Sequence, residues 1–166
     1  MIGFMREDIC TMPSMKWTQL NHIQLGRYGE YYAKMEFTSY GYDVYTSEVD
    51  NHGVDFVVKN PNNNHFYEVQ VKSICKCNYA FIKKDKILLD DYHLVCLLHF
   101  IDGELPDMYI IPATVWKSPC RLFADRKYNK QGQKTKPEYG INYSKRNLNL
   151  LNKYTAEKYF IENCKT

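Results

Sequence analysis

The chain of 166 residues contains 45% hydrophobic and 15% aromatic residues, so it can bury a core without help from disulfides or metal ions. Its net charge is only +3, and no apolar run approaches the roughly 18 residues of a membrane-spanning helix. Because the first residues also lack the basic start and long apolar stretch of a signal peptide, we expect a cytoplasmic protein, folded as one domain over residues 1–166, with no membrane partner.

A first helix is predicted from about residue 14 or 16 to about residue 39, ending before Gly41. Five residues recur at spacings of three and four and define one helical stripe: Ile23, Gly26, Glu30, Ala33 and Phe37. Glu30 therefore occupies a core-facing position, where an ionised carboxylate is costly unless it is paired, hydrogen-bonded or near a metal ion. Its place on the stripe is either an edge effect or functional.

Strand candidates follow at 42–46, 54–58 and 65–74, and their short connections suggest an antiparallel meander. Residues 78–91 mix a short apolar patch with charged side chains and fit either a hairpin or a helix. The nearly continuous apolar run 93–101 predicts a central strand covered on both faces. A short strand is predicted at 108–111, and residues 113–123 are compatible with a short helix.

Residues 117–146 form a basic segment with nine basic and two acidic residues, a net charge of +7 that leaves −4 on the rest of the chain. Concentrated positive charge is expected of a polyanion binder, because neutralising phosphates releases counterions. A solvated, lysine-rich loop is the alternative, and residues 129–137 have the composition of an exposed loop. The candidate phosphate-contacting residues are Arg27 on the first helix and Arg126, Lys127, Lys130, Lys134 and Lys136 in the segment.

A final amphipathic helix is predicted over about 148–163, with Leu148, Leu151, Tyr154 and Tyr159 on its buried side. The chain then reads as a helix, three strands, a mixed segment, two strands and a terminal helix. This order predicts an α/β (α+β) domain in which helices flank a mixed five-stranded sheet.

The run 66–72 alternates polar and apolar residues. Successive side chains of a strand point to opposite faces, so Glu68, Gln70 and Lys72 share one face. If Asp55 lies at the same level on the neighbouring strand, a carboxylate, an amide oxygen, a backbone carbonyl and an ammonium converge on one metal ion. Such a site suits phosphodiester hydrolysis, whereas the alternation taken alone also describes an exposed strand face.

The histidines and cysteines do not indicate a metal site of their own. The five histidines lack HxxxH and HxxEH spacing, which argues against zinc. Cys75 and Cys77 would need two further clustered ligands. The six cysteines are scattered without CxxC spacing, so we expect reduced thiols.

Together, a glutamate on the first helix (Glu30), an aspartate on the second strand (Asp55) and the pair Gln70-x-Lys72 on the third strand resemble the PD-(D/E)XK nuclease superfamily. The spacing is closer to its Gln-x-Lys branch, which includes group I intron-encoded homing endonucleases, and the resemblance covers about residues 23–111. It implies a restriction-endonuclease-like core and an endonuclease that hydrolyses DNA to 5′-phosphate and 3′-hydroxyl ends. It also implies Mg²⁺ as cofactor, with Mn²⁺ as a substitute, and a homodimer or higher oligomer acting on double-stranded DNA.

The resemblance further implies a role for each site residue. Asp55 is the main metal ligand, and the side-chain oxygen of Gln70 with the carbonyl of Val71 completes the protein's share of a magnesium site. Lys72 orients or helps to deprotonate the attacking water and stabilises charge on the scissile phosphate. Glu30 binds the metal through water or helps to hold a second ion.

Gln70 departs from the commonest pattern of the superfamily, because a neutral amide is a weaker ligand than a carboxylate. Glu68, two residues earlier on the same strand face, is an accessory candidate that compensates for this loss, or else a solvated surface residue. Two other functions therefore stay open. One is a catalytically weak or inactive nucleic-acid-binding module with the same fold, and the other is a protein-interaction domain that uses its aromatic surface.

Overall fold

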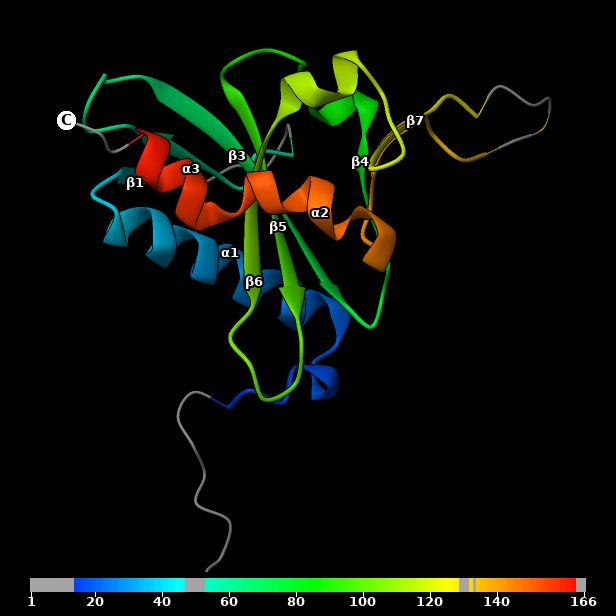
Figure 1. The fold of residues 1–166 in the computed structure, drawn as a ribbon, viewed down its shortest axis with the longest axis horizontal. Coiled ribbons are helices and arrows are strands. Elements are labelled where there is room, and N and C mark those ends of the chain that lie inside the picture. Colours follow the sequence, from blue (N-terminus) through cyan, green and yellow to red (C-terminus); the bar gives the residue numbers. More distant parts are fainter. Residues whose placement is uncertain (1–13, 47–52, 129–131, 133, 164–166) are drawn as a thin grey trace, which may run out of the picture.

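The computed structural model describes residues 14–46, 53–128, 132 and 134–163, which form two sheets and several helices (Figure 1). The strands are β1 (Asp43–Tyr45), β2 (Phe56–Lys59), β3 (Phe66–Cys75), β4 (Tyr79–Lys83), β5 (His93–Phe100), β6 (Asp107–Pro112), β7 (Phe123–Arg126) and β8 (Glu138–Asn142). The helices are α1 (His22–Ser39), α2 (Leu148–Leu151) and α3 (Ala156–Asn163). None of the helices in the described part of the chain has the length and apolar composition needed to cross a bilayer.

The larger sheet has five strands in the order β1-β2-β3-β5-β6. β1, β2 and β3 form the predicted antiparallel meander, β3 runs parallel to β5, and β5 is antiparallel to β6. Parallel neighbours need a long crossover, and here the crossover contains β4, which belongs to a second sheet with the order β4-β8-β7. The predicted α+β class with a mixed five-stranded sheet is confirmed.

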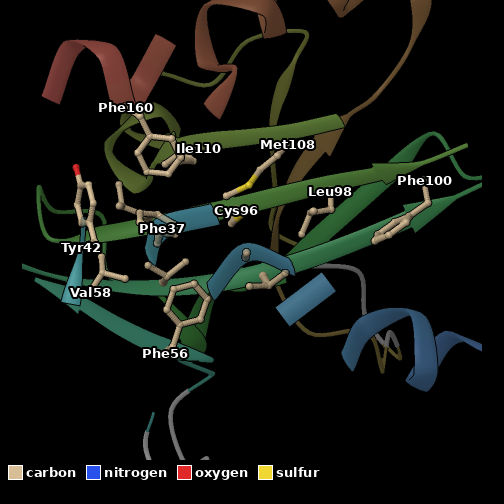
Figure 2. Packing of buried hydrophobic residues seen from close by; sticks show 14 of the residues in the cluster. Phe37, Tyr42, Phe56, Val58, Cys96, Leu98, Phe100, Met108, Ile110 and Phe160 are labelled. Atoms are coloured by element: carbon tan, nitrogen blue, oxygen red, sulfur yellow. The ribbon is translucent and has the colours of Figure 1, made fainter. Parts of the chain in front are cut away.

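Apolar side chains cover both faces of the larger sheet. Along β5, Leu94 and Cys96 belong to the cluster that contains side chains of α1 and α3, and Figure 2 shows Phe160 of α3 in this layer. Val95 and Leu97 belong to the second cluster, with side chains of β4, β7 and β8. β5 is therefore buried on both faces, as its nearly continuous apolar sequence predicted.

α1 begins at His22, later than predicted, because the chain is capped at Asn21. The Asn21 side chain accepts hydrogen bonds from the backbone amides of Ile23 and Gln24, and the Gln24 side chain accepts one from the Asn21 amide. This reciprocal capping box fixes the start of the helix. Residues 17–19 before it form a separate 3₁₀ turn, and the helix ends at Ser39 as predicted.

The buried stripe of α1 differs in part from the predicted one. Its buried residues are Leu25, Gly29, Ala33 and Phe37. Ala33 and Phe37 were predicted to face the core, but Ile23 is 70% exposed and Glu30 and Gly26 lie at the margin of the buried stripe. The stripe is set by Gly29, where the helix approaches the sheet so closely that a Cβ atom would overlap Ser73 Oγ of β3.

The segments without a clear sequence pattern have mixed structure. Residues 78–91 contain β4 and a 3₁₀ turn at Lys84–Lys86, and Ala113–Lys117 is also a 3₁₀ turn. The continuous helix predicted over about 148–163 is interrupted: α2 and α3 are separated by a 3₁₀ turn and by Thr155, whose backbone is extended. Thr155 forms a β-bridge with Tyr109 of β6, and this tertiary contact is incompatible with helical backbone at that position.

We expect Gly29→Ala to destabilise the protein by about 1–3 kcal/mol, the usual cost of overpacking a close contact. The new methyl group would overlap Ser73 Oγ and touch Leu98. The matched control is Gly26→Ala, where nothing lies within 4 Å of the added atom, so the better helix propensity of alanine should stabilise by about 0.5–1 kcal/mol. Denaturant unfolding measures both changes.

A double-mutant cycle tests the assigned contact itself. Adding Ser73→Ala to Gly29→Ala removes the overlapping hydroxyl, so the double variant should recover part of the lost stability. Additive effects of the two substitutions would contradict direct packing of Gly29 on Ser73.

Candidate metal centre

The ladder between strands β2 and β3 ends next to Asp55. β2 pairs with β3 only from Phe56, opposite Val69, to Lys59, opposite Phe66. Just before β2 begins, the Asp55 amide donates to the Val69 carbonyl at 2.9 Å, and the Val71 amide donates to Asp55 Oδ2 at 2.5 Å. One carboxylate oxygen thus takes the place of a strand carbonyl and fixes the aspartate side chain against the edge of β3.

Gln70 lies at the level of Asp55, one pair beyond Phe56 and Val69 in the register. Its side chain is on the sheet face opposite to Val69 and Val71, which pack in the cluster with α1. Gln70 is only 9% exposed, and within the described residues its Oε1 has no hydrogen-bond partner. An orphaned buried acceptor costs about 1–3 kcal/mol, so this oxygen fits a ligand that supplies positive charge.

The Val71 carbonyl faces the same edge of β3 as Asp55. The N–H and C=O of one strand residue point to the same side, and the Val71 N–H is the group bound by Asp55. The candidate donors at this edge are therefore a carboxylate, an amide oxygen and a backbone carbonyl. Oxygen donors of this kind suit a hard divalent cation such as Mg²⁺, which keeps several of its waters.

Lys72 lies two residues beyond Gln70 on β3 and shares its face. It is partly buried, and its register partner is Leu97 of β5. The structure thus carries Asp55, Gln70, Val71 and Lys72 on adjoining positions of β3 and the chain entering β2.

Glu30 is placed on α1, directly after Gly29. Gly29 packs on Ser73, which shares a sheet face with Val69 and Val71, so α1 covers the face of β3 opposite to Gln70 and Lys72. Its carboxylate accepts a hydrogen bond from Arg27 Nη1 at 2.6 Å. Arg27, a candidate DNA contact, is therefore paired with a candidate metal-site residue, although its side chain is 62% exposed.

Glu68 is held by a histidine. His93 Nε2 lies 3.0 Å from Glu68 Oε2, and His93 Nδ1 lies 2.6 Å from Asp90 Oδ1. The His93 ring therefore lies between two carboxylates, one of which is Glu68. Burial opposes ionisation of Asp90, but hydrogen bonds from His93 and the Tyr92 amide prevail and lower the pKa of this carboxyl.

Within the described residues, no three His, Cys, Asp or Glu side chains come together in a metal-binding cluster. Glu30, Asp55 and Glu68 are therefore not gathered as a carboxylate triad. The proposed donor set has one carboxylate, that of Asp55, with Gln70 and Val71 supplying neutral oxygens.

A further acidic group near the sheet, Glu36 of α1, was not predicted from the sequence. Burial raises the pKa of the Cys96 thiol, and the charges of Asp55 and Glu36 raise it further. Burial and the neighbouring Glu36 also raise the pKa of Tyr32 to about 12. No sequence motif identifies Glu36. It is one of several acidic residues on an amphipathic helix, and only the packing of the helix on the sheet distinguishes it.

The sequence also did not indicate Lys86 as a residue of the candidate site. Gly53, two residues before Asp55, has φ +79°, and a Cβ atom there would lie 3.0 Å from both Gln70 Nε2 and Lys86 Cβ. The backbone entering the site thus lies against the side chains of Gln70 and Lys86. Lys86 falls in residues 78–91, whose conformation the sequence left open.

The described candidate DNA contacts of the basic segment lie on β7 and the chain between β7 and β8. Lys127 and Lys134 are exposed. Arg126 donates to Tyr128 Oη at 3.3 Å and stacks over the Tyr79 ring, whereas Lys136 is paired with Asp85 at 3.0 Å. Lys130 lies outside the described residues.

The sheet order β1-β2-β3-β5-β6 and the positions of these residues on β3 and before β2 define the geometry of the candidate metal centre. No protein-family model and no curated protein matches the chain. The chain is similar to the solved structure of a bacterial homing endonuclease, I-Ssp6803I, at 17% identity and a TM-score of 0.49, over 85% of this chain and 91% of the other. It is also similar to Hjc, a Holliday junction resolvase of Archaeoglobus fulgidus, at 12% identity and a TM-score of 0.42, over 70% and 83% of the two chains.

Proposed function

We propose that this protein is a metal-dependent DNA endonuclease that hydrolyses phosphodiester bonds and leaves 5′-phosphate and 3′-hydroxyl ends. One observation carries the proposal. Asp55 is locked to the Val71 amide at the level of a buried Gln70 whose Oε1 has no partner among the described residues. This edge of β3 thus offers a carboxylate and a buried amide oxygen to a cation.

The donors fit Mg²⁺, with Mn²⁺ as a substitute, held by Asp55, the Gln70 side-chain oxygen and the Val71 carbonyl. Glu30 assists through water or a second ion. When bound, the ion offsets the negative charge that grows on the phosphate during hydrolysis. Glu68 is the accessory carboxylate, oriented by His93.

Lys72 then acts on the nucleophile and the phosphate. Its ammonium orients the attacking water, eases loss of the water's proton to solvent through its positive charge, and stabilises charge on the non-bridging phosphate oxygens. The water oxygen forms a bond to phosphorus as the bond from phosphorus to the 3′ oxygen breaks. The leaving 3′ oxygen takes a proton from solvent, which gives the 3′-hydroxyl.

Double-stranded DNA is the proposed partner. The basic segment supplies phosphate contacts through Arg126, Lys127, Lys130, Lys134 and Lys136, and Arg27 adds one from α1. A single site cuts one strand, so a homodimer or higher oligomer is proposed for cutting both strands.

A second candidate function is a nucleic-acid-binding module with the same fold and little or no catalysis. The neutral Gln70 favours it, because the donor set then holds only one carboxylate and binds a cation more weakly. A binding module of this kind should still bind DNA in chelator and after the charge of Asp55 is removed.

The decisive experiment is cleavage of supercoiled and linear DNA by purified protein in magnesium, manganese or chelator. We expect metal-dependent nicking or linearisation, and we expect Lys72→Ala to lower the rate by at least about 100-fold, the usual range for a lost acid–base or charge-stabilising group. Lys59→Ala, on the neighbouring strand, is the control. A fully active Lys72→Ala protein would refute the nuclease proposal.

A further inference from the structure

Residues 83–86, at the end of β4 and in the turn that follows, form a charged run whose side chains contact different elements. Lys84 forms an ion pair with Asp125 of β7, and its ammonium lies 4.8 Å from the centre of the Tyr139 ring. Asp85 is paired with Lys136. These pairs tie the run to the second sheet. Lys86, the last residue of the run, lies against Gly53.

The stem of Lys86 runs beside Gly53. A Cβ atom on Gly53 would lie 3.0 Å from Lys86 Cβ, 3.4 Å from Lys86 Cδ and 3.0 Å from Gln70 Nε2. Lys86 Cδ and the Gln70 amide therefore lie within a few ångströms of the same point, on the chain that leads into Asp55. The ammonium is two bonds beyond Cδ, so it lies within reach of a group bound at this centre.

The fold holds Lys86 in this position. The residue ends the 3₁₀ turn Lys84–Lys86, whose first amide donates to the Pro137 carbonyl at 3.1 Å. Ile87, which follows, is 8% exposed and belongs to the apolar cluster between the two sheets. The turn is thus anchored on both sides, and the partly buried Lys86 is positioned by the fold.

We infer that Lys86 is a second lysine of the metal centre and that its ammonium binds a phosphate of the DNA strand at this site. The inference rests on the proposed function. Lys72 reaches the centre along β3, whereas Lys86 reaches it from the second sheet, past Gly53. A compact ammonium with three donors suits the non-bridging oxygens of a phosphodiester.

The test measures DNA affinity against salt in chelator, so that it does not depend on cleavage. Lys86→Met keeps an unbranched stem against Gly53 and removes the charge, Lys86→Arg restores a charge, and Lys83→Met alters an exposed lysine of the same run. One lost phosphate contact should reduce the slope of log affinity against log salt by about 0.9. We expect this reduction for Lys86→Met, recovery for Lys86→Arg, and the wild-type slope for Lys83→Met.

The outcomes separate this inference from the proposed function. Wild-type cleavage with an unchanged slope for Lys86→Met overturns the inference and leaves the nuclease standing. A reduced slope without cleavage in any metal supports the phosphate contact and rejects catalysis. If Lys86→Met and Lys86→Arg lose DNA affinity and thermal stability equally, Lys86 has a packing role and the inference is overturned. If the wild type shows no salt-sensitive DNA binding, both the inference and the proposed nuclease function are rejected.

Discussion

Asp55→Asn is expected to lower metal-dependent cleavage by at least about 10³-fold, or about 4 kcal/mol of transition-state stabilisation. The substitution removes the one carboxylate of the proposed donor set. Because asparagine keeps a side-chain oxygen, it can still accept the hydrogen bond from the Val71 amide, so the local backbone should remain in place. Cleavage rates at saturating DNA measure the effect.

Thermal unfolding with and without magnesium supplies a readout independent of activity. A ligand that binds the folded state raises its stability, so magnesium should raise the unfolding temperature of the wild type and leave that of Asp55→Asn nearly unchanged. Asp43→Asn, an exposed aspartate on β1, is the matched control and should behave as the wild type. An inactive Asp55→Asn protein that still gains stability from magnesium would mean that the ion binds elsewhere.

Local patterns predicted the five-stranded sheet because each of its strands carries its own signal. Alternation along β3 separates Gln70 and Lys72 from Val69 and Val71, and the apolar β5 indicates burial on both faces. These signals are properties of single strands and need no knowledge of the rest of the fold. The same alternation placed the predicted polar residues on one face of β3.

The helical predictions were less complete because their outcome depends on tertiary contacts. Two stripes on α1 share Ala33 and Phe37, and the close approach of Gly29 to Ser73 decides between them. The final helix is broken where Thr155 pairs with β6, a contact over 40 residues away in sequence. Neither contact has a sequence signal of its own.

The surroundings of the candidate site were hidden for the same reason. Glu68 was predicted as a ligand or a solvated residue, but the parallel pairing of β3 with β5 sets His93 beside it. Lys86 comes from the crossover between those two strands, and only the folded chain places it against Gly53. Sequence spacing reveals residues that share one strand, whereas these neighbours come from different elements.

Gln70→Met is expected to abolish metal-dependent cleavage and to raise the free energy of unfolding by about 1 kcal/mol. The two effects share one cause. Gln70 Oε1 is buried and has no partner within the described residues, which is costly in the metal-free protein and useful only when a cation is bound. Methionine fills a similar volume without the orphaned oxygen. Denaturant unfolding in chelator and cleavage in magnesium measure the two changes.

Gln70→Glu provides the opposite perturbation at the same position. A buried carboxylate should destabilise the metal-free protein, because its charge loses hydration without gaining a partner. In magnesium the added charge strengthens the donor set, so this variant should show a larger metal-dependent rise in unfolding temperature than the wild type and retain cleavage.

The three proteins together test whether stability is given up for metal binding at this position. In chelator the Gln70→Met variant should be the most stable, the wild type intermediate and the Gln70→Glu variant the least stable. In magnesium the unfolding temperature of the Gln70→Glu variant should rise the most. A methionine variant that cleaves as well as the wild type removes Gln70 from the donor set. A methionine variant that is inactive but also less stable in chelator shows that the amide oxygen is satisfied within the protein, and then the physical case for a cation at this edge of β3 rests on Asp55 alone.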